Sequence, residues 1–275
     1  MIACYTSVIE TVNNDSPLWE KDGTNEYYLH GPLARMEVGQ QRVQGMDYAY
    51  TLQGWMKGVN SSILDANRDM GSDGLFATNT ARDALAFMIG YYDGDYQQVN
   101  GSPIELGYSG TSFGNASPSL YKGNIRNISM GIKGLETIGY TYKYDQLNRL
   151  VEMNPYNQID QLNYAWQISG NAMTNYRVRL KFDPNGNVMR LERWANNFQK
   201  MDNFFYNYNS GTNQLQYIDD FQPAGNFSDD IDDQNPNNYT YDGAGNLKTD
   251  VQSGIFDLRW SNYGRILRVD LSNDK

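Results

Sequence analysis

The stretch YTYDGAGNL, Tyr239 to Leu247, places tyrosine at every second position and follows it with an aspartate, a glycine-rich segment and a leucine. Alternation with a period of two is typical of a β-strand with one buried face, and DGAGN is rich in residues that favour turns. The leucine then opens a second strand, so the stretch predicts a β-hairpin. A similar order of residues recurs along the chain, and recurrence indicates architecture before it indicates catalysis.

Other copies follow the same plan. YTYKYDQLNRL runs from Tyr140 to Leu150, and VRLKFDPNGNV runs from Val178 to Val188. Two further copies turn at NSGTNQ and SNYGR, and divergent copies occur in EYYLHGPLARMEV (Glu26 to Val38) and MDYAYTLQGWMKGV (Met46 to Val59). The spacing between copies varies, which indicates hairpins of different lengths.

Composition narrows the classes of function. The chain has 275 residues, 22 tyrosines and a formal net charge of −10, with a sequence pI near 4.6 and a mean hydropathy of −0.68. So acidic a chain lacks the basic surface of a nucleic-acid binder, and anionic membranes would repel it. The sequence contains no apolar run long enough to span a membrane. Its N-terminus lacks the basic and apolar regions of a signal peptide, which fits a cytoplasmic protein or a chain that starts inside something larger.

Helical patterns are scarce. The best candidate is TARDALAFMIG, Thr80 to Gly90, where Thr80 could cap a helix and Gly90 could end it. Leu85, Phe87 and Ile89 also alternate, however, and we favour a strand there. We therefore predict strand content well above the ~20–25% of ordinary soluble domains and helix below ~15%.

The pattern Tyr-x-Tyr-Asp-x-x-Gly-Arg/Asn-Leu resembles the YD repeat of the Rhs/YD-repeat family, in its Bacteroidetes type. YTYDGAGNL is close to an ideal copy, with Tyr241, Asp242 and Gly245 in place. In the other copies, Asn148 stands where glycine is usual and Phe182 stands where tyrosine is usual. The residues that match the pattern are Tyr144, Asp145, Asp183, Gly186 and Gly264. The resemblance is strong after Tyr140 and weak between Ser62 and Lys122.

The resemblance implies an all-β fold in which tandem antiparallel β-hairpins form a curved, spiralling sheet, part of a hollow shell. We expect one domain over residues 1–275, with degenerate hairpins in 1–60, irregular hairpins that carry insertions in 61–139, and clear YD repeats in 140–275. Tyrosine would pack its ring on one sheet face while its hydroxyl reaches water or a polar partner. The aspartate would cap the turn, and glycine or asparagine would supply the positive φ. We expect Gly186 and Gly245 at positive φ.

In this family the shell encloses or presents a C-terminal toxin or effector, outside the cell or at its surface. The resemblance therefore implies a non-catalytic scaffold that needs no cofactor and whose partners are the rest of its shell or its cargo. DPNGN at Asp183 is a turn within a repeat rather than the closing segment of such a shell, so we interpret the chain as a partial shell without an effector. The segment Cys4 to Val12 has few charges, and we expect it to pair with another chain or to fold back onto the sheet.

An alternative is a carbohydrate-binding or adhesion module, in which exposed aromatic rings stack on glycans. The candidate rings are those of Trp55, Trp166, Trp194 and Trp260. Aromatic residues are also common on ordinary sheet faces, and we favour that explanation. The sole histidine, His30, lies in a predicted turn and is a poor candidate for catalysis.

One loop has a weak calcium pattern. In DANRDMGSDG, Asp65 to Gly74, oxygen-bearing side chains stand at positions 1, 3, 5 and 9 of an EF-hand-like loop, namely Asp65, Asn67, Asp69 and Asp73. Met70 and Phe76 occupy the positions that need glycine and glutamate. We therefore favour a polar loop tip and predict no metal.

Overall fold

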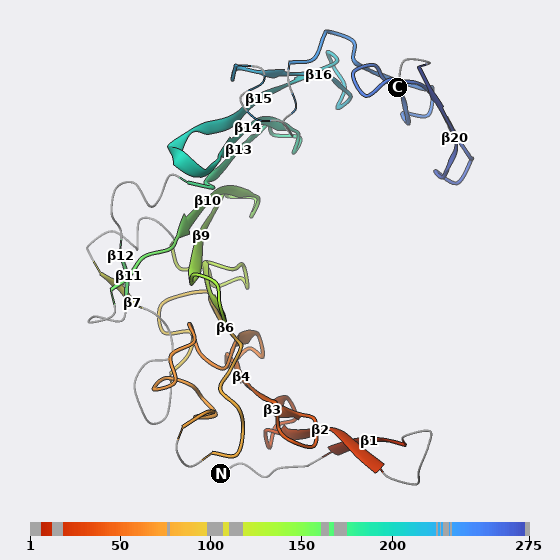
Figure 1. Ribbon diagram of the computed structural model, residues 1–275. Helices are drawn as coiled ribbons and strands as arrows, with labels where there is room; N and C mark the ends of the chain where they lie inside the picture. Colours follow the sequence, from red (N-terminus) through yellow and green to blue (C-terminus); the bar gives the residue numbers. More distant parts are fainter. Residues whose placement is uncertain are drawn as a thin grey trace. The chain divides into compact units, whose positions relative to one another are not determined.

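The computed structural model describes residues 7–12, 19–75, 78–97, 107–109, 118–160, 165–167, 175–223, 225, 227, 231 and 233–272 (Figure 1). Regular structure in these ranges is β-strand apart from one 3-10 turn, η1 (Asn196–Phe198). The prediction of an all-β fold built from tandem antiparallel hairpins is confirmed. The chain divides into two compact units, which we describe separately: Met1–Lys143 with Asn154–Met173, and Tyr144–Met153 with Thr174–Lys275.

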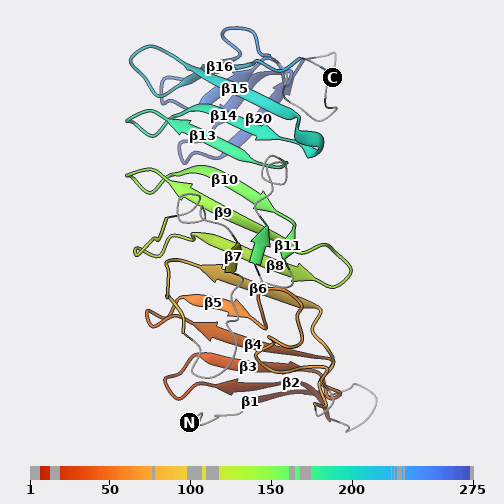
Figure 2. The ribbon, with the colours of Figure 1, turned by 90° about the vertical axis from the view of Figure 1, so that its left-hand side faces the viewer.

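The first unit contains an antiparallel sheet in which neighbours in the sheet follow chain order, as Figure 2 shows. Its strands are β1 (Ser7–Val12), β2 (Trp19–Tyr27), β3 (Leu33–Val38), β4 (Gln44–Tyr50), β5 (Met56–Val59), β6 (Leu85–Gly90), β8 (Asn127–Ile132) and β9 (Ile138–Tyr144). The predicted strand within Thr80 to Gly90 is therefore present as β6. Of the segment Cys4 to Val12, the structure describes residues 7–12, which form β1 and pair with β2.

A three-stranded sheet also belongs to the first unit. It comprises β7 (Gly107–Ser109), β11 (Ile159–Asp160) and β12 (Ala165–Gln167), and β12 pairs parallel to β7. Trp166 of β12 is 1% exposed and lies beside Tyr156, with ring centroids 6.3 Å apart. A Cβ on Gly139 of β9 would approach the Trp166 ring to 2.5 Å, so this glycine makes room for the ring.

The second unit is a series of hairpins. Its first ladder joins β10 (Leu150–Tyr156), β13 (Val178–Phe182), β14 (Val188–Trp194), β15 (Lys200–Tyr208) and β16 (Leu215–Asp220). A four-stranded sheet follows, made of β17 (Tyr239–Tyr241), β18 (Leu247–Asp250), β19 (Ile255–Trp260) and β20 (Ile266–Leu271). All of these neighbours are antiparallel.

The segment between β5 and β6, residues 60–84, is an insertion in the first unit, and it packs on the sheet. A Cβ on Gly131 of β8 would lie 3.0 Å from the Leu64 nitrogen, so the insertion and the strand are in close contact. Asn60 fixes the start of the insertion, because its side-chain oxygen accepts the Asp47 N–H at 2.7 Å and its amide donates to the Leu85 carbonyl at 2.8 Å. The insertion thereby contacts β4 at Asp47, and its Asp73 accepts a hydrogen bond from Arg35 of β3, where the side chains described next converge.

Candidate functional site

The same five-residue turn closes hairpins of the second unit. The first residue donates its N–H to the carbonyl of the fifth, and the fourth donates its N–H to the carbonyl of the first, as at Asp242–Asn246 with distances of 2.9 and 3.0 Å. The fourth residue has a positive φ of 60° to 96° in the turns that begin at Asp145, Asp183, Asp242 and Ser261, where it is Asn148, Gly186, Gly245 and Gly264. The expected positive φ values of Gly186 and Gly245 are therefore found.

The aspartate of the repeat holds the turn through its carboxylate. One oxygen of Asp242 accepts the N–H groups of Ala244 and Asn246, both at 2.9 Å, and the other accepts the Asn246 side-chain amide at 2.9 Å. These hydrogen bonds, led by that of the Asn246 side chain, lower the pKa of Asp242. Ser261 performs the same role with its hydroxyl, which accepts the N–H groups of Tyr263 and Arg265.

A β-bulge lies immediately before three of these turns, those that begin at Asp183, Asp242 and Ser261. The strand register shifts between Thr240 and Tyr241, and equivalent shifts occur before Phe182 and Trp260. A type I turn followed by a residue in the left-handed region commonly combines with such a bulge. The last aromatic side chain of the strand lies at this bulge and, at Tyr241 and Trp260, contacts the preceding hairpin.

That aromatic residue joins successive hairpins. The Tyr241 hydroxyl donates to the Leu215 carbonyl at 2.9 Å, and Leu215 opens the second strand of the preceding hairpin. We call this hydrogen bond a repeat bridge. Two more repeat bridges occur in the second unit: Tyr208 Oη to the Val188 carbonyl at 2.8 Å and Trp260 Nε1 to the Leu247 carbonyl at 2.6 Å. The hydroxyl that the sequence assigns to water or a polar partner thus has a defined partner.

Phe182 occupies the bridging position but has no hydroxyl. An arginine of the preceding repeat makes the contact between the hairpins instead. The Arg149 guanidinium lies 4.7 Å from the centroid of the Phe182 ring, and its Nη1 donates to the Asp183 carbonyl at 2.9 Å. A cation over an aromatic ring is attracted by the ring's electron density. Here the earlier hairpin supplies the hydrogen-bond donor and the later hairpin supplies the carbonyl acceptor, the reverse of a repeat bridge.

A different kind of site lies in the first unit, around Arg35 of β3. Its Nη1 donates to Asp47 of β4, its Nη2 to Asp73 of the insertion at 2.7 Å, and its Nε to Glu37 at 3.3 Å. The Asp73 side chain is only 1% exposed. One cation thus faces several carboxylates in a half-buried setting, and burial, opposed by Arg35, raises the pKa of Asp47 to about 6.

Beside Arg35 three carboxylates gather, and we call Asp69, Asp73 and Asp83 the acidic cluster. One oxygen from each lies within 4.8 Å of the others. Each carboxylate also has one buried oxygen without a hydrogen-bond partner: Oδ1 of Asp69, Oδ2 of Asp73 and Oδ1 of Asp83. Burial and the neighbouring Asp69 charge raise the pKa of Asp83 to about 8, and burial also raises the pKa of Asp69.

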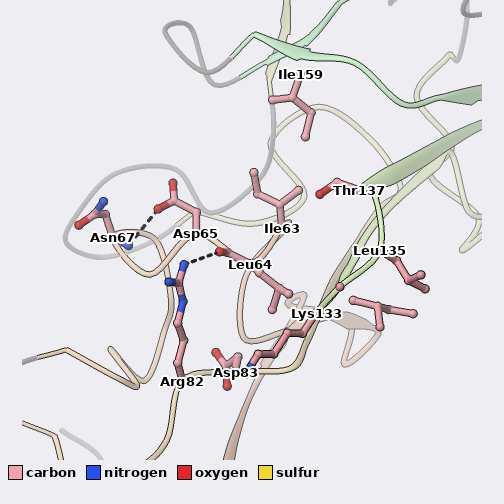
Figure 3. Close-up of a pocket in the computed structure, with 12 residues that line it drawn as sticks. Ile63, Leu64, Asp65, Asn67, Arg82, Asp83, Lys133, Leu135, Thr137 and Ile159 are labelled. Carbon is pink, nitrogen blue, oxygen red and sulfur yellow. Dashed lines mark hydrogen bonds between the residues drawn. The ribbon is translucent and has the colours of Figure 1, made fainter.

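Two hollows adjoin the acidic cluster. A surface pocket of about 670 Å³ is lined by residues of the insertion and by the turn after β8, among them Asp65, Arg82 and Asp83 (Figure 3). Arg82 reaches across it to the Leu64 carbonyl at 3.2 Å. A space of about 10 Å³ lies deeper, lined by all three carboxylates of the cluster. Asp83 borders both, so the small space adjoins the open pocket.

Of the four side chains in the calcium-like sequence pattern, the structure brings two together. Asp69 and Asp73 belong to the acidic cluster, whereas Asp65 accepts the Asn67 N–H at 3.0 Å and pairs with Arg68. Asp83 joins the cluster instead, and nothing in the sequence pattern singles it out. His30 stacks on the Tyr28 ring with centroids 5.4 Å apart.

The tryptophans of the glycan alternative are engaged within the protein. Trp166 is buried and Trp260 forms a repeat bridge. Trp55 packs against Tyr91, with ring centroids 5.0 Å apart. The Trp194 ring is covered by cations, of which the nearest is the Lys200 ammonium at 4.9 Å.

No helix among the described residues has the length and apolar character needed to cross a membrane. Comparison with protein-family models gives no match, and comparison with curated proteins gives none. Among solved structures, the chain is similar to part of a chain in the crystal structure of TcdB2-TccC3-Cdc42, at 10% sequence identity and a TM-score of 0.31. The similarity covers 91% of this chain and 12% of that chain. So low a TM-score supports no functional conclusion.

Proposed function

We propose that this chain is a non-catalytic scaffold, a segment of a shell of the Rhs/YD-repeat type. The observation that supports it is the repeat bridge combined with the five-residue turn. In the repeat, the aspartate holds the turn, the glycine or asparagine supplies its positive φ, and the aromatic residue ties one hairpin to the one before. The residues that recur in the sequence thus have architectural contacts, and this supports a scaffold role.

By the same resemblance, the partners are the remainder of the shell and an effector that it encloses or presents, and the place of action is outside the cell or at its surface. Shells of repeated hairpins depend on continuous pairing between neighbours. Strand edges that lack a neighbour can pair with a second chain. Self-association through such an edge is part of this proposal.

A glycan-binding role is the second candidate, and the contacts of the tryptophans argue for the scaffold instead. A ring that stacks on a sugar needs an open face. Cations cover the Trp194 ring, and Trp166 is 1% exposed. Both rings contribute to the structure of their own unit.

The test is protease protection of the cargo in the native assembly. We would isolate the assembly that contains this chain from its source cells, digest it under native conditions and identify the surviving polypeptides by mass spectrometry. We expect a second polypeptide that survives with the parent chain and is digested when the turns carry Gly186→Val and Gly245→Val. The matched control is Gly186→Asn with Gly245→Asn, since Asn148 already adopts this conformation.

Equal digestion of every accompanying polypeptide in the parent and in the valine variant would contradict the scaffold role. A glycan array run on the purified chain addresses the alternative. Suppose that the parent chain binds a glycan and that Trp55→Ala abolishes the binding without changing the far-UV circular dichroism spectrum. That result would favour an adhesion module over the scaffold.

A further inference from the structure

The three carboxylates of the acidic cluster come from two places in the chain. Asp69 and Asp73 lie in the insertion after β5, and Asp83 lies two residues before β6 begins. Asp73 is 2% exposed and Asp83 is 7% exposed, so these are interior groups rather than a solvated acidic face. Burying an ionised carboxylate is unfavourable unless it is paired, hydrogen-bonded or bound to a metal.

Two arginines lie beside this cluster, Arg35 and Arg82, and Arg82, which also lines the deeper space, donates to the Leu64 carbonyl. Arg35 is held by Asp47 and Asp73, and neither Asp69 nor Asp83 forms an ion pair within the part of the chain that the structure describes. Each carboxylate keeps one buried oxygen without a hydrogen-bond donor. Each of these three oxygens has lone pairs available, and no group in the described part of the chain donates a hydrogen bond to it.

The dimensions of the site fit one cation. Its ligand atoms lie within 4.8 Å of one another, and the space that the three side chains line measures about 10 Å³. A space of this size accommodates about one water-sized particle. Oxygens around Ca²⁺ lie at ~2.3–2.6 Å, so opposite ligands are separated by up to ~5 Å, whereas around Mg²⁺ they are separated by only ~4 Å.

We propose that Asp69, Asp73 and Asp83 bind a calcium ion. All donors are hard carboxylate oxygens, and the adjoining pocket of about 670 Å³ gives water access to complete the six to eight ligands that Ca²⁺ prefers. This site is independent of the proposed scaffold role, and it differs from the EF-hand-like pattern because Asp83 is a ligand and Asn67 is not.

The surroundings hold the carboxylates in place before any ion arrives. Arg35 takes the second oxygen of Asp73 at 2.7 Å, and the Asp73 N–H donates to the second oxygen of Asp69 at 2.7 Å. Gly45 of β4 makes room for Asp73, because a Cβ there would lie 2.0 Å from Asp73 Oδ2. Hydrogen bonds to the non-ligating atoms of a carboxylate orient the ligand and support affinity.

A bound ion would join the insertion to the start of β6. The insertion connects β5 to β6, and the ion would connect its middle, at Asp69 and Asp73, with its end, at Asp83. Binding to the folded state alone stabilises that state in proportion to the logarithm of the ion concentration. Calcium would therefore set how firmly residues 60–84 are held.

The experiment uses the purified chain after removal of metal with EDTA and dialysis. Isothermal titration with CaCl₂ and with MgCl₂ gives stoichiometry and affinity, and thermal unfolding gives the Tm. We expect one Ca²⁺ per chain, weaker binding of Mg²⁺, and a rise in Tm of about 5–10 °C at a hundred times the Kd. Asp83→Asn should weaken calcium binding at least ~10-fold.

Asp83→Asn keeps the shape of the side chain and removes a buried carboxyl from a crowded acidic group, so the metal-free variant should unfold at the same Tm as the metal-free parent or above it. The matched control is Asp257→Asn, which removes an acid of the second unit and should leave calcium binding unchanged. No heat and no Tm shift up to about 10 mM Ca²⁺, beyond the weakest protein calcium sites, would overturn the proposal. Undiminished binding by Asp83→Asn would also overturn it, and equal affinity for Mg²⁺ would overturn the choice of calcium.

Discussion

The hydroxyl of Tyr241 donates a hydrogen bond to the backbone carbonyl of Leu215 at 2.9 Å, across the boundary between two hairpins of the second unit. Strands β16 and β17 belong to different sheets, so this bond replaces part of the pairing that a continuous ladder would provide. Gln234 supports the same boundary, because its backbone N–H donates to the Ile218 carbonyl at 3.0 Å and its side chain donates to the Tyr239 hydroxyl at 2.9 Å.

Removing the hydroxyl should weaken this boundary. We expect Tyr241→Phe to lower the free energy of unfolding by about 0.5–1.5 kcal/mol, since the Leu215 carbonyl loses its donor while the ring stays packed. Urea denaturation measures the change. The matched control is Tyr263→Phe, because Tyr263 is 93% exposed and its hydroxyl has no bridging role. Equal effects of the two substitutions would show that the repeat bridge does not contribute.

The glycine of the repeat should tolerate asparagine but not valine. Gly245 has φ of 88° and a Cβ there would meet nothing within 4 Å, so the effect of a substitution is backbone strain rather than collision. We expect Gly245→Val to destabilise the chain by about 1–3 kcal/mol and Gly245→Asn by much less. The two variants would be compared by thermal unfolding, and a valine variant as stable as the asparagine variant would contradict the strain argument.

The turn aspartates should make stability sensitive to acid. The Arg149 backbone N–H, with further hydrogen bonds, lowers the pKa of Asp145, and the Asn246 side chain does so for Asp242. A folded-state pKa below the unfolded value gives stability that is present above about pH 4 and is lost as the pH falls through the folded pKa.

Serine provides the control for that prediction. Ser261 holds the same turn with a hydroxyl that does not titrate, so Asp145→Ser with Asp242→Ser should fold and should lose less stability than the parent between about pH 4 and pH 2. Urea denaturation at several pH values gives the comparison. Parallel pH profiles for the parent and the double variant would show that the two carboxylates do not contribute.

A buried ion pair in the first unit should be sensitive to the loss of one partner. Lys57 Nζ and Asp95 Oδ1 are 2.7 Å apart, with side chains 0% and 1% exposed. We expect Lys57→Met to destabilise by about 3–5 kcal/mol because it leaves the Asp95 charge buried without its cation. Lys57→Met with Asp95→Asn should recover much of that loss, since asparagine can still accept the Tyr91 N–H. If the double variant is as unstable as Lys57→Met alone, the loss comes from packing rather than from the unpaired charge.

The N-terminal strand should control self-association. Strand β1 pairs with β2 and stands at the end of its sheet, so its other side offers backbone groups to a second chain. We expect the parent to self-associate in light scattering and Val8→Lys with Thr11→Lys to suppress it. The control is Leu52→Lys with Leu147→Lys, which adds the same charge at exposed turn positions. A monomeric parent would contradict the prediction.

The hairpins could be predicted from sequence because their signals are local. Alternating aromatics predict a strand, and Asp183 with Gly186 predicts the turn that the structure contains. The repeat bridge could not be predicted, since the acceptor is a backbone carbonyl and leaves no trace in the sequence. The acidic cluster was only half predictable: Asp69 and Asp73 share a loop, but Asp83 reaches them only because the insertion returns to β6.

The repeat bridges of the second unit have a direction. In each of them the donor comes later in the chain than the acceptor: Tyr208 reaches back to Val188, Tyr241 to Leu215 and Trp260 to Leu247. During synthesis the ribosome releases the acceptor strand first, so each new aromatic side chain emerges when its docking carbonyl is already in place. Within the second unit, the repeat bridges of a hairpin therefore need no sequence further along the chain, and we expect nascent chains arrested after a hairpin of that unit to hold its preceding hairpins in their final form.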